Sequence, residues 1–120
     1  MDINEFAISV HENSVDKGWY EVQRPFSEIV AMCHTELSEA MNCHRDGEDH
    51  LYFRSLTTGN KLATMRVTEE EIEHLRLRPE GAPIELVDCV LRIFDYLVSE
   101  GYDVEELMTL KHNFNLTRGY

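Results

Sequence analysis

The sequence predicts an all-α fold of the four-helix-bundle type, with a small hairpin and a short helix inserted between its two acidic helices. Apolar residues recur at helical spacing in each long segment, and capping residues or prolines precede these segments. Residues 46–79 lose this rhythm and carry turn residues and β-tolerant stretches instead. At 120 residues the chain is expected to form a single domain, 1–120, with 46–79 as its insert.

The segment Pro83–Gly101 is the centre of this prediction. Pro83 suits the first position of a helix, and Gly101 suits its end. Apolar side chains cover most of its circumference, which is typical of a buried helix. The remaining side chains form one narrow strip, here called the polar seam: Glu85, Asp88, Arg92, Asp95 and Ser99. Burying carboxylates is costly unless they are paired or hold a metal ion, so this seam is the main functional clue.

Three more helices are expected, at residues 2–17, 25–45 and 103–115. Asp2 and Asp103 are the expected N-caps of the first and the last of them. On the second, Glu36 and Glu39 lie at the edge of the apolar face, which consists of Ile29, Val30, Cys33, Leu37, Ala40 and Met41. The two glutamates are three residues apart and are therefore neighbours on the helix, although such a pair by itself is typical of a solvated face.

The insert is expected to begin with a hairpin. Its strands are Leu51–Ser55 and Lys61–Val67, around a turn at residues 56–60. Thr68 and Glu71 form a capping-box pattern for a short helix that ends near Arg76. Residues 78–83 are then expected to be a linker that leads into the central helix, and the insert could serve as a lid or as a surface for a partner.

Charge and composition exclude several classes of function. The formal net charge of −12 argues against a nucleic-acid polymer as partner, because such binding depends on clustered Lys and Arg. A small phosphorylated ligand is still compatible, since a metal ion can bridge carboxylates to phosphate oxygens. No apolar run is long enough for a membrane span, and the acidic N-terminus does not resemble a signal peptide. With three cysteines, an odd number, the expected location is the reducing cytoplasm.

Two acidic pairs are the candidate metal ligands. Glu36 and Glu39 form one pair, and Glu85 and Asp88 form the other. If their helices pack side by side, four carboxylates converge and repel one another unless cations lie among them. Ligands that are all oxygen indicate Mg²⁺ or Mn²⁺ rather than zinc. Magnesium keeps open coordination positions, which suits phosphate binding and the activation of water.

Two further places could contact a ligand. Trp19, the only tryptophan, is either a core residue at a helix junction or a flat platform for a nucleobase. In the last helix, Lys111, Asn115 and Arg118 continue the apolar stripe with polar side chains that could bind phosphate. The alternative for these three is a frayed and solvated C-terminus.

Taken together, four stretches resemble the MazG-like, all-α nucleoside triphosphate pyrophosphohydrolases. They are residues 34–40 (HTELSEA), 79–88 (PEGAPIELVD), 92–95 (RIFD) and 111–118 (KHNFNLTR). The resemblance spans nearly the whole chain and includes the early Gly18-Trp19-Tyr20. One departure is the separation of Glu39 from Glu85 by 45 residues, more than the compact family pattern usually carries.

The resemblance implies a Mg²⁺-dependent enzyme that cleaves the α–β phosphoanhydride of an NTP or dNTP, and that assembles as a homodimer or homotetramer. The metal ligands that the resemblance implies are Glu36, Glu39, Glu85 and Asp88. Glu36 or Glu39 would also act as the base that activates water. The implied substrate contacts are Trp19, Lys111, Asn115 and Arg118. Arg92 and Asp95 are expected to form a supporting ion pair. Two alternatives are a phosphoribosyl-ATP-type pyrophosphohydrolase and a non-catalytic helical module that binds nucleotides or proteins.

Overall fold

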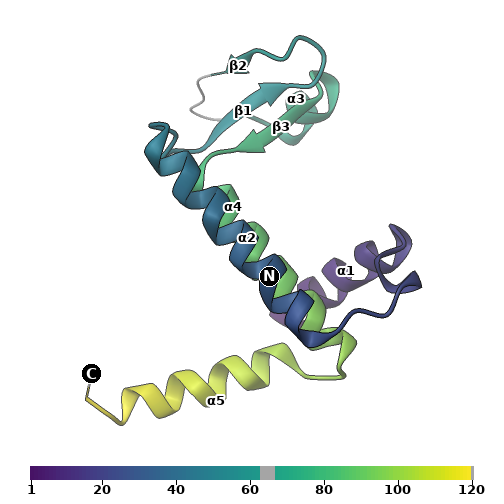
Figure 1. Ribbon diagram of the computed structural model, residues 1–120, viewed down its shortest axis with the longest axis vertical. Helices are drawn as coiled ribbons and strands as arrows, with labels where there is room; N and C mark the ends of the chain where they lie inside the picture. Colours follow the sequence, from purple (N-terminus) through teal and green to yellow (C-terminus); the bar gives the residue numbers. More distant parts are fainter. Residues whose placement is uncertain (63–66, 120) are drawn as a thin grey trace. The chain divides into compact units, whose positions relative to one another are not determined.

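The computed structural model describes residues 1–62 and 67–119 (Figure 1). In these residues helices predominate, and a small antiparallel sheet accompanies them. The elements are α1 (Ile3–Asp16), the 3₁₀-helix η1 (Trp19–Glu21), α2 (Phe26–Arg45), β1 (Tyr52–Ser55), β2 (Lys61–Leu62), α3 (Glu69–His74), β3 (Leu77–Glu80), α4 (Ala82–Ser99) and α5 (Val104–Leu116). None of the described helices combines the length and the hydropathy that crossing a bilayer requires.

The helix ends agree with the capping residues read from the sequence. The Asp2 carboxylate accepts a hydrogen bond from the Glu5 backbone N–H at 2.9 Å. At α5, the Asp103 carboxylate accepts from the Glu106 backbone N–H at 2.8 Å. Each cap satisfies a donor that the helix cannot, so these predicted starts are confirmed.

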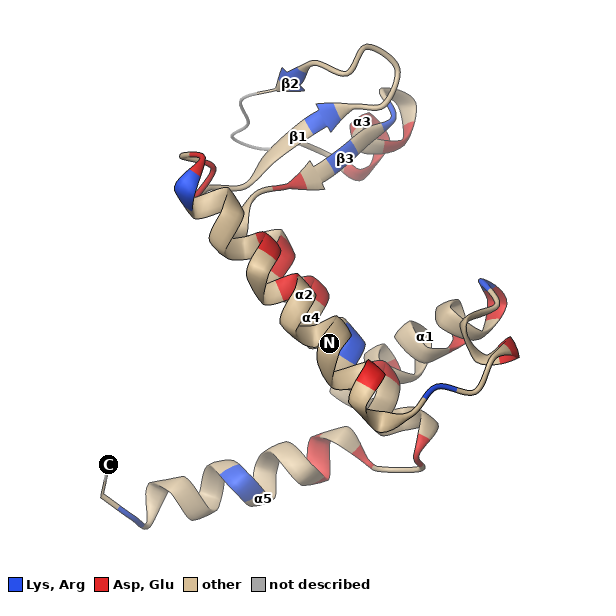
Figure 2. Ribbon diagram, viewed as in Figure 1, with Lys and Arg blue, Asp and Glu red and all other residues tan. Residues whose placement is uncertain are grey.

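The chain divides into two compact units. One contains residues 32–89, and the other contains residues 1–31 together with 90–120. Both α2 and α4 contribute a part to each unit. Figure 2 shows acidic stretches on both helices within the unit 32–89.

The sheet lies in the unit 32–89 and has the order β2-β1-β3. The predicted hairpin is present, because β1 pairs with β2 in the antiparallel register Phe53↔Leu62. The rest of its expected second strand, residues 63–66, lies outside the described residues. Tyr52, Phe53 and Leu77 are buried and form the core of the sheet.

The third strand corrects the sequence prediction. Residues 77–80 fall largely in the expected linker but pair with β1 as an antiparallel strand, in the register Phe53↔Pro79. Pro79 is tolerated there because β3 is an edge strand. The described fold is therefore mostly helical, as predicted, but the expected hairpin is part of a three-stranded antiparallel sheet.

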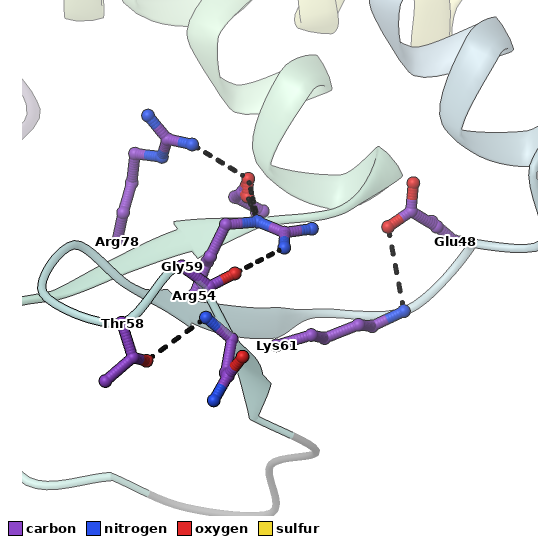
Figure 3. A network of polar contacts seen from close by, with 8 residues as sticks. Glu48, Arg54, Thr58, Gly59, Lys61 and Arg78 are labelled. Carbon is purple, nitrogen blue, oxygen red and sulfur yellow. Dashed lines mark hydrogen bonds and ion pairs between the residues drawn. The ribbon is translucent and has the colours of Figure 1, made fainter.

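Charged side chains bind the three strands together (Figure 3). Glu80 of β3 accepts from Arg54 Nε of β1 at 3.1 Å and from Arg78 Nη2 at 3.1 Å. Lys61 Nζ of β2 lies 3.6 Å from the Glu48 carboxylate, which precedes β1. These contacts hold the sheet beside the point where the chain enters α4.

Gly81 makes that entry possible. Its φ of +110° is a conformation that other residues rarely adopt, and a Cβ there would overlap the His50 carbonyl oxygen. Directly after it, the Ala82 N–H donates to the Glu48 carbonyl at 3.0 Å. The sheet thus fixes the first turn of α4, which includes Glu85.

The other unit is built around the contact between α1 and α5. Ala7 and Val104 are 0% and 1% exposed and form its centre. Asn4 joins the two helices, because its side chain donates to Asp103 Oδ1 at 2.9 Å and accepts from the Glu105 N–H at 3.0 Å. Aromatic contacts add Phe94 of α4 against Phe6 of α1.

The orientation of α4 differs from the expectation of a helix with a buried apolar circumference. Asp95 in the polar seam is only 7% exposed. On the opposite side, four large apolar side chains are 42–49% exposed: Leu86, Val87, Val90 and Ile93. On α2, Leu37 and Met41 of the expected core face are likewise exposed. Apart from Ser99, the polar seam of α4 is thus less exposed in the described residues than this apolar face.

Candidate metal centre

Three carboxylates from two helices meet in the unit 32–89. Glu36 and Glu39 of α2 and Glu85 of α4 each place a carboxylate oxygen within 4.8 Å of the others. The i,i+3 spacing puts both α2 glutamates on one side of that helix, and the entry at Gly81 brings the first turn of α4 to them. We call these three residues the carboxylate trio.

The trio runs from the interior to the surface. Glu36 is 6% exposed, Glu85 is half-buried and Glu39 is exposed. The burial of Glu36 contradicts the reading of the α2 pair as an ordinary solvated face. A group that is anchored inside and open at one edge can hold an ion and still admit a ligand from solvent.

Crowding of negative charge changes the acidity of Glu85. Its pKa is raised to about 7, first by burial, then by a hydrogen bond with Glu39 and by the charges of Glu39, Asp88 and Glu36. Carboxylates so close together repel when all are ionised, so a shared proton or a cation stabilises the group. Glu39 and Glu85 share such a hydrogen bond here, and a divalent cation in place of the proton would relieve the same repulsion.

Asp88 and Cys43 border the trio. Asp88 lies one helical turn after Glu85 and raises its pKa through its charge, although it does not belong to the group within 4.8 Å. The pKa of the Cys43 thiol is raised by burial and then by the charge of Glu85. The sequence predicted Cys43 as an ordinary helix residue and not as part of the site, but its position four residues after Glu39 puts it on the same helix face.

The donor set suits a hard divalent cation. All three ligand groups in the trio are carboxylates, which are the ligands that Mg²⁺ and Mn²⁺ prefer. Mg²⁺ takes six ligands, so a trio of carboxylates leaves positions for water and for phosphate oxygens. The residues present therefore fit the metal that the sequence predicts.

The residues expected to contact substrate all belong to the other unit. Trp19 is half-buried, and the Arg24 guanidinium lies 3.7 Å from its ring centroid, so one face already carries a cation. Lys111 and Arg118 lie 5.1 and 5.3 Å from the ring centroid of Phe114. Within the described residues, Asn115 Oδ1 is buried without a hydrogen-bond partner. Their roles toward a nucleotide stay predictions.

Asp95 has a structural environment that the sequence did not reveal. Its Oδ1 lies 2.8 Å from His11 Nδ1 and accepts from the Tyr20 hydroxyl at 2.7 Å. The expected partner, Arg92, has its guanidinium 5.4 Å from the centroid of the Trp19 ring. Asp95 thus ties α1 and η1 to α4.

Comparison of the chain with models of protein families, with curated proteins and with solved structures found no match. Function must accordingly be inferred from the residues and their geometry. The feature with the clearest chemical meaning is the carboxylate trio.

Proposed function

We propose that this chain is a Mg²⁺-dependent nucleoside triphosphate pyrophosphohydrolase, which converts an NTP or dNTP into a monophosphate and pyrophosphate. The observation that carries the proposal is the approach of Glu36, Glu39 and Glu85 to within 4.8 Å. The trio supports a metal site, and the resemblance to the MazG-like enzymes supplies the reaction. Mn²⁺ is the expected substitute for Mg²⁺.

In this proposal the trio and Asp88 hold the metal. When bound, the ion neutralises phosphate charge and lowers the pKa of a bound water. Glu39 is the more exposed of the two α2 glutamates, so its carboxylate can reach solvent and accept a proton from the attacking water. The water oxygen then bonds to the α-phosphorus, the bond from that phosphorus to the α–β bridging oxygen breaks, and pyrophosphate leaves.

Substrate contacts form the second part of the proposal. Lys111, Asn115 and Arg118 would bind the β- and γ-phosphates, and Trp19 would stack on the base. The unpartnered Asn115 Oδ1 and the two cations beside Phe114 support a polar site at the end of α5. Alanine at Lys111 or Arg118 is expected to raise KM more than it lowers kcat, since these residues would bind phosphates in the ground state as well.

Assembly is the third part. The outward apolar face of α4 supports a homo-oligomer, a dimer or a tetramer, in which helices of two copies complete four-helix bundles. A helix with this much apolar surface gains stability when a second helix covers it. The oligomer is an expectation for the metal-loaded and the metal-free protein alike.

The decisive experiment incubates the full chain and Mg²⁺ with all common NTPs and dNTPs and with phosphoribosyl-ATP, and measures monophosphate and pyrophosphate. Glu39→Gln and Asp88→Asn are expected to lose nearly all turnover while circular dichroism shows a folded protein. Glu73→Gln, an exposed α3 glutamate in the same unit, is the matched control and should keep full turnover. Binding of nucleotides without any pyrophosphate release would overturn the proposal and favour the non-catalytic module.

A further inference from the structure

A hollow lies in the unit that contains residues 1–31 and 90–120, whereas the carboxylate trio belongs to the unit 32–89. It has a volume of about 420 Å³ and lies between residues 19–24 and the C-terminal end of α4. Trp19, Tyr20 and Tyr96 provide aromatic walls. Its size is in the range of sites for small organic molecules.

The hydroxyl groups of this hollow have already used their donors. The Tyr20 hydroxyl donates to Asp95 Oδ1 at 2.7 Å, and the Ser99 hydroxyl donates to the Tyr96 carbonyl at 2.6 Å. Ser99 also hydrogen-bonds the Tyr20 side chain, and since each hydroxyl has only one hydrogen to donate, these oxygens offer a ligand lone pairs rather than donors. The pKa of Tyr20 is raised to about 12 by burial and by Asp95, so its proton stays in place at neutral pH.

The charges that line the hollow are mostly negative. Arg24, the cation among its lining residues, donates from Nη1 to the Trp19 carbonyl at 2.6 Å, and its Nε lies 3.5 Å from the Glu28 carboxylate. The Arg92 guanidinium lies 5.4 Å from the centroid of the Trp19 ring. Glu21 and Glu100 also line the hollow, and the charge of Glu100 raises the pKa of both Tyr20 and Tyr96. A ligand therefore meets carboxylates, hydroxyl acceptors and aromatic rings.

We propose that this hollow binds an organic ammonium ion, which is a protonated amine with N–H donors and an apolar or aromatic body. The ammonium group would donate to the carboxylates of Glu21 and Glu100 and to the Tyr20 oxygen. Its body would pack on the aromatic walls, where cation–π attraction adds to the contact. Arg24 on Trp19 already shows a cation at such a ring. The hollow shares the Trp19 wall with the proposed contact to the base, but the observations that support it do not involve the carboxylate trio.

The experiment uses the full chain and the fluorescence of Trp19, which is the only tryptophan. Phenethylammonium is the probe, titrated at neutral pH and constant ionic strength. Its neutral and anionic counterparts are 2-phenylethanol and 3-phenylpropionate, and AMP tests a nucleotide on the same wall. We expect saturable binding of the ammonium at about millimolar Kd, as a ligand of this size allows, and at least about tenfold weaker binding of the other three.

Glutamine variants test whether the carboxylates of Glu21 and Glu100 accept hydrogen bonds from the ammonium group. Glu100→Gln and Glu21→Gln each keep the shape of the wall and are expected to weaken ammonium binding at least about fivefold. Glu105→Gln, an exposed α5 residue, makes the same change in net charge and should stay within about twofold. The proposal would be overturned if 2-phenylethanol bound as tightly as the ammonium, or if AMP bound more tightly. It would also be overturned if Glu105→Gln weakened ammonium binding as much as Glu21→Gln and Glu100→Gln do. Circular dichroism confirms that each variant is folded.

Discussion

Replacing Glu85 with glutamine should change how stability depends on pH and on metal. In the folded chain the pKa of Glu85 is raised to about 7, whereas its ordinary value is 4.5. Between these values the folded state binds more protons than the unfolded state, so the stability of the metal-free protein falls as pH rises. Glutamine cannot ionise, and this contribution disappears in the variant.

The size of the effect follows from the shift and from solvent exposure. A pKa change from 4.5 to about 7 corresponds to about 3 kcal/mol when the group is shielded from solvent. Glu85 is only half-buried and Glu39 is exposed, so screening reduces the contribution to about 1 kcal/mol. For a chain of 120 residues this is about 4 °C in Tm.

Thermal unfolding followed by circular dichroism provides the assay. In a chelating buffer, Glu85→Gln should match the parent near pH 5 and exceed its Tm by about 4 °C near pH 8. Millimolar Mg²⁺ should reverse the order near pH 8, because only the parent has the full ligand set. Glu73→Gln controls for the loss of one negative charge. A constant Tm difference across this pH range, or equal stabilisation of parent and Glu85→Gln by Mg²⁺, would refute the reasoning.

Three further substitutions test other parts of the structure. Gly81→Ala should lower stability by about 2 kcal/mol through its positive φ and the overlap with His50, and a thermal melt no different from that of Gly119→Ala would contradict this. Asp95→Ala should cost about 2–3 kcal/mol in denaturant unfolding, because two partners lose a buried acceptor, and a loss below about 0.5 kcal/mol would show that the tie is unimportant. Val90→Asp should convert the expected oligomer to monomer in light scattering, whereas unchanged mass would place the interface elsewhere.

Local chemistry explains what the sequence predicted well. Asp2, Thr68 and Asp103 cap their helices through hydrogen bonds to residues three positions ahead, so the relevant partners are visible in the sequence itself. The same holds for Glu36 and Glu39, whose spacing alone makes them neighbours. Their approach to Glu85 could be anticipated because all three belong to long helices with clear periodicity.

Contacts between distant segments explain what the sequence missed. β3 contains Pro79, which weakens any strand signal, and its pairing with β1 joins segments about 26 residues apart. The burial of Glu36 depends on which side of α2 meets α4, and periodicity assigned the apolar side to the core. The tie of Asp95 to His11 spans 84 residues, and no local pattern announces it.

The orientation of α4 about its own axis links the proposed metal site to the proposed oligomer. Turning Glu85 toward the α2 glutamates places Leu86 and Val90 about 100° and 140° around the helix, and both are exposed. In the proposal, the orientation that forms the cation site therefore leaves an apolar face uncovered, and a second copy would bury that face. In Val90→Asp the trio is untouched, so stabilisation by Mg²⁺ should persist in a monomer. If Mg²⁺ no longer raised Tm in that folded monomer, the second copy would have to be part of the metal site itself.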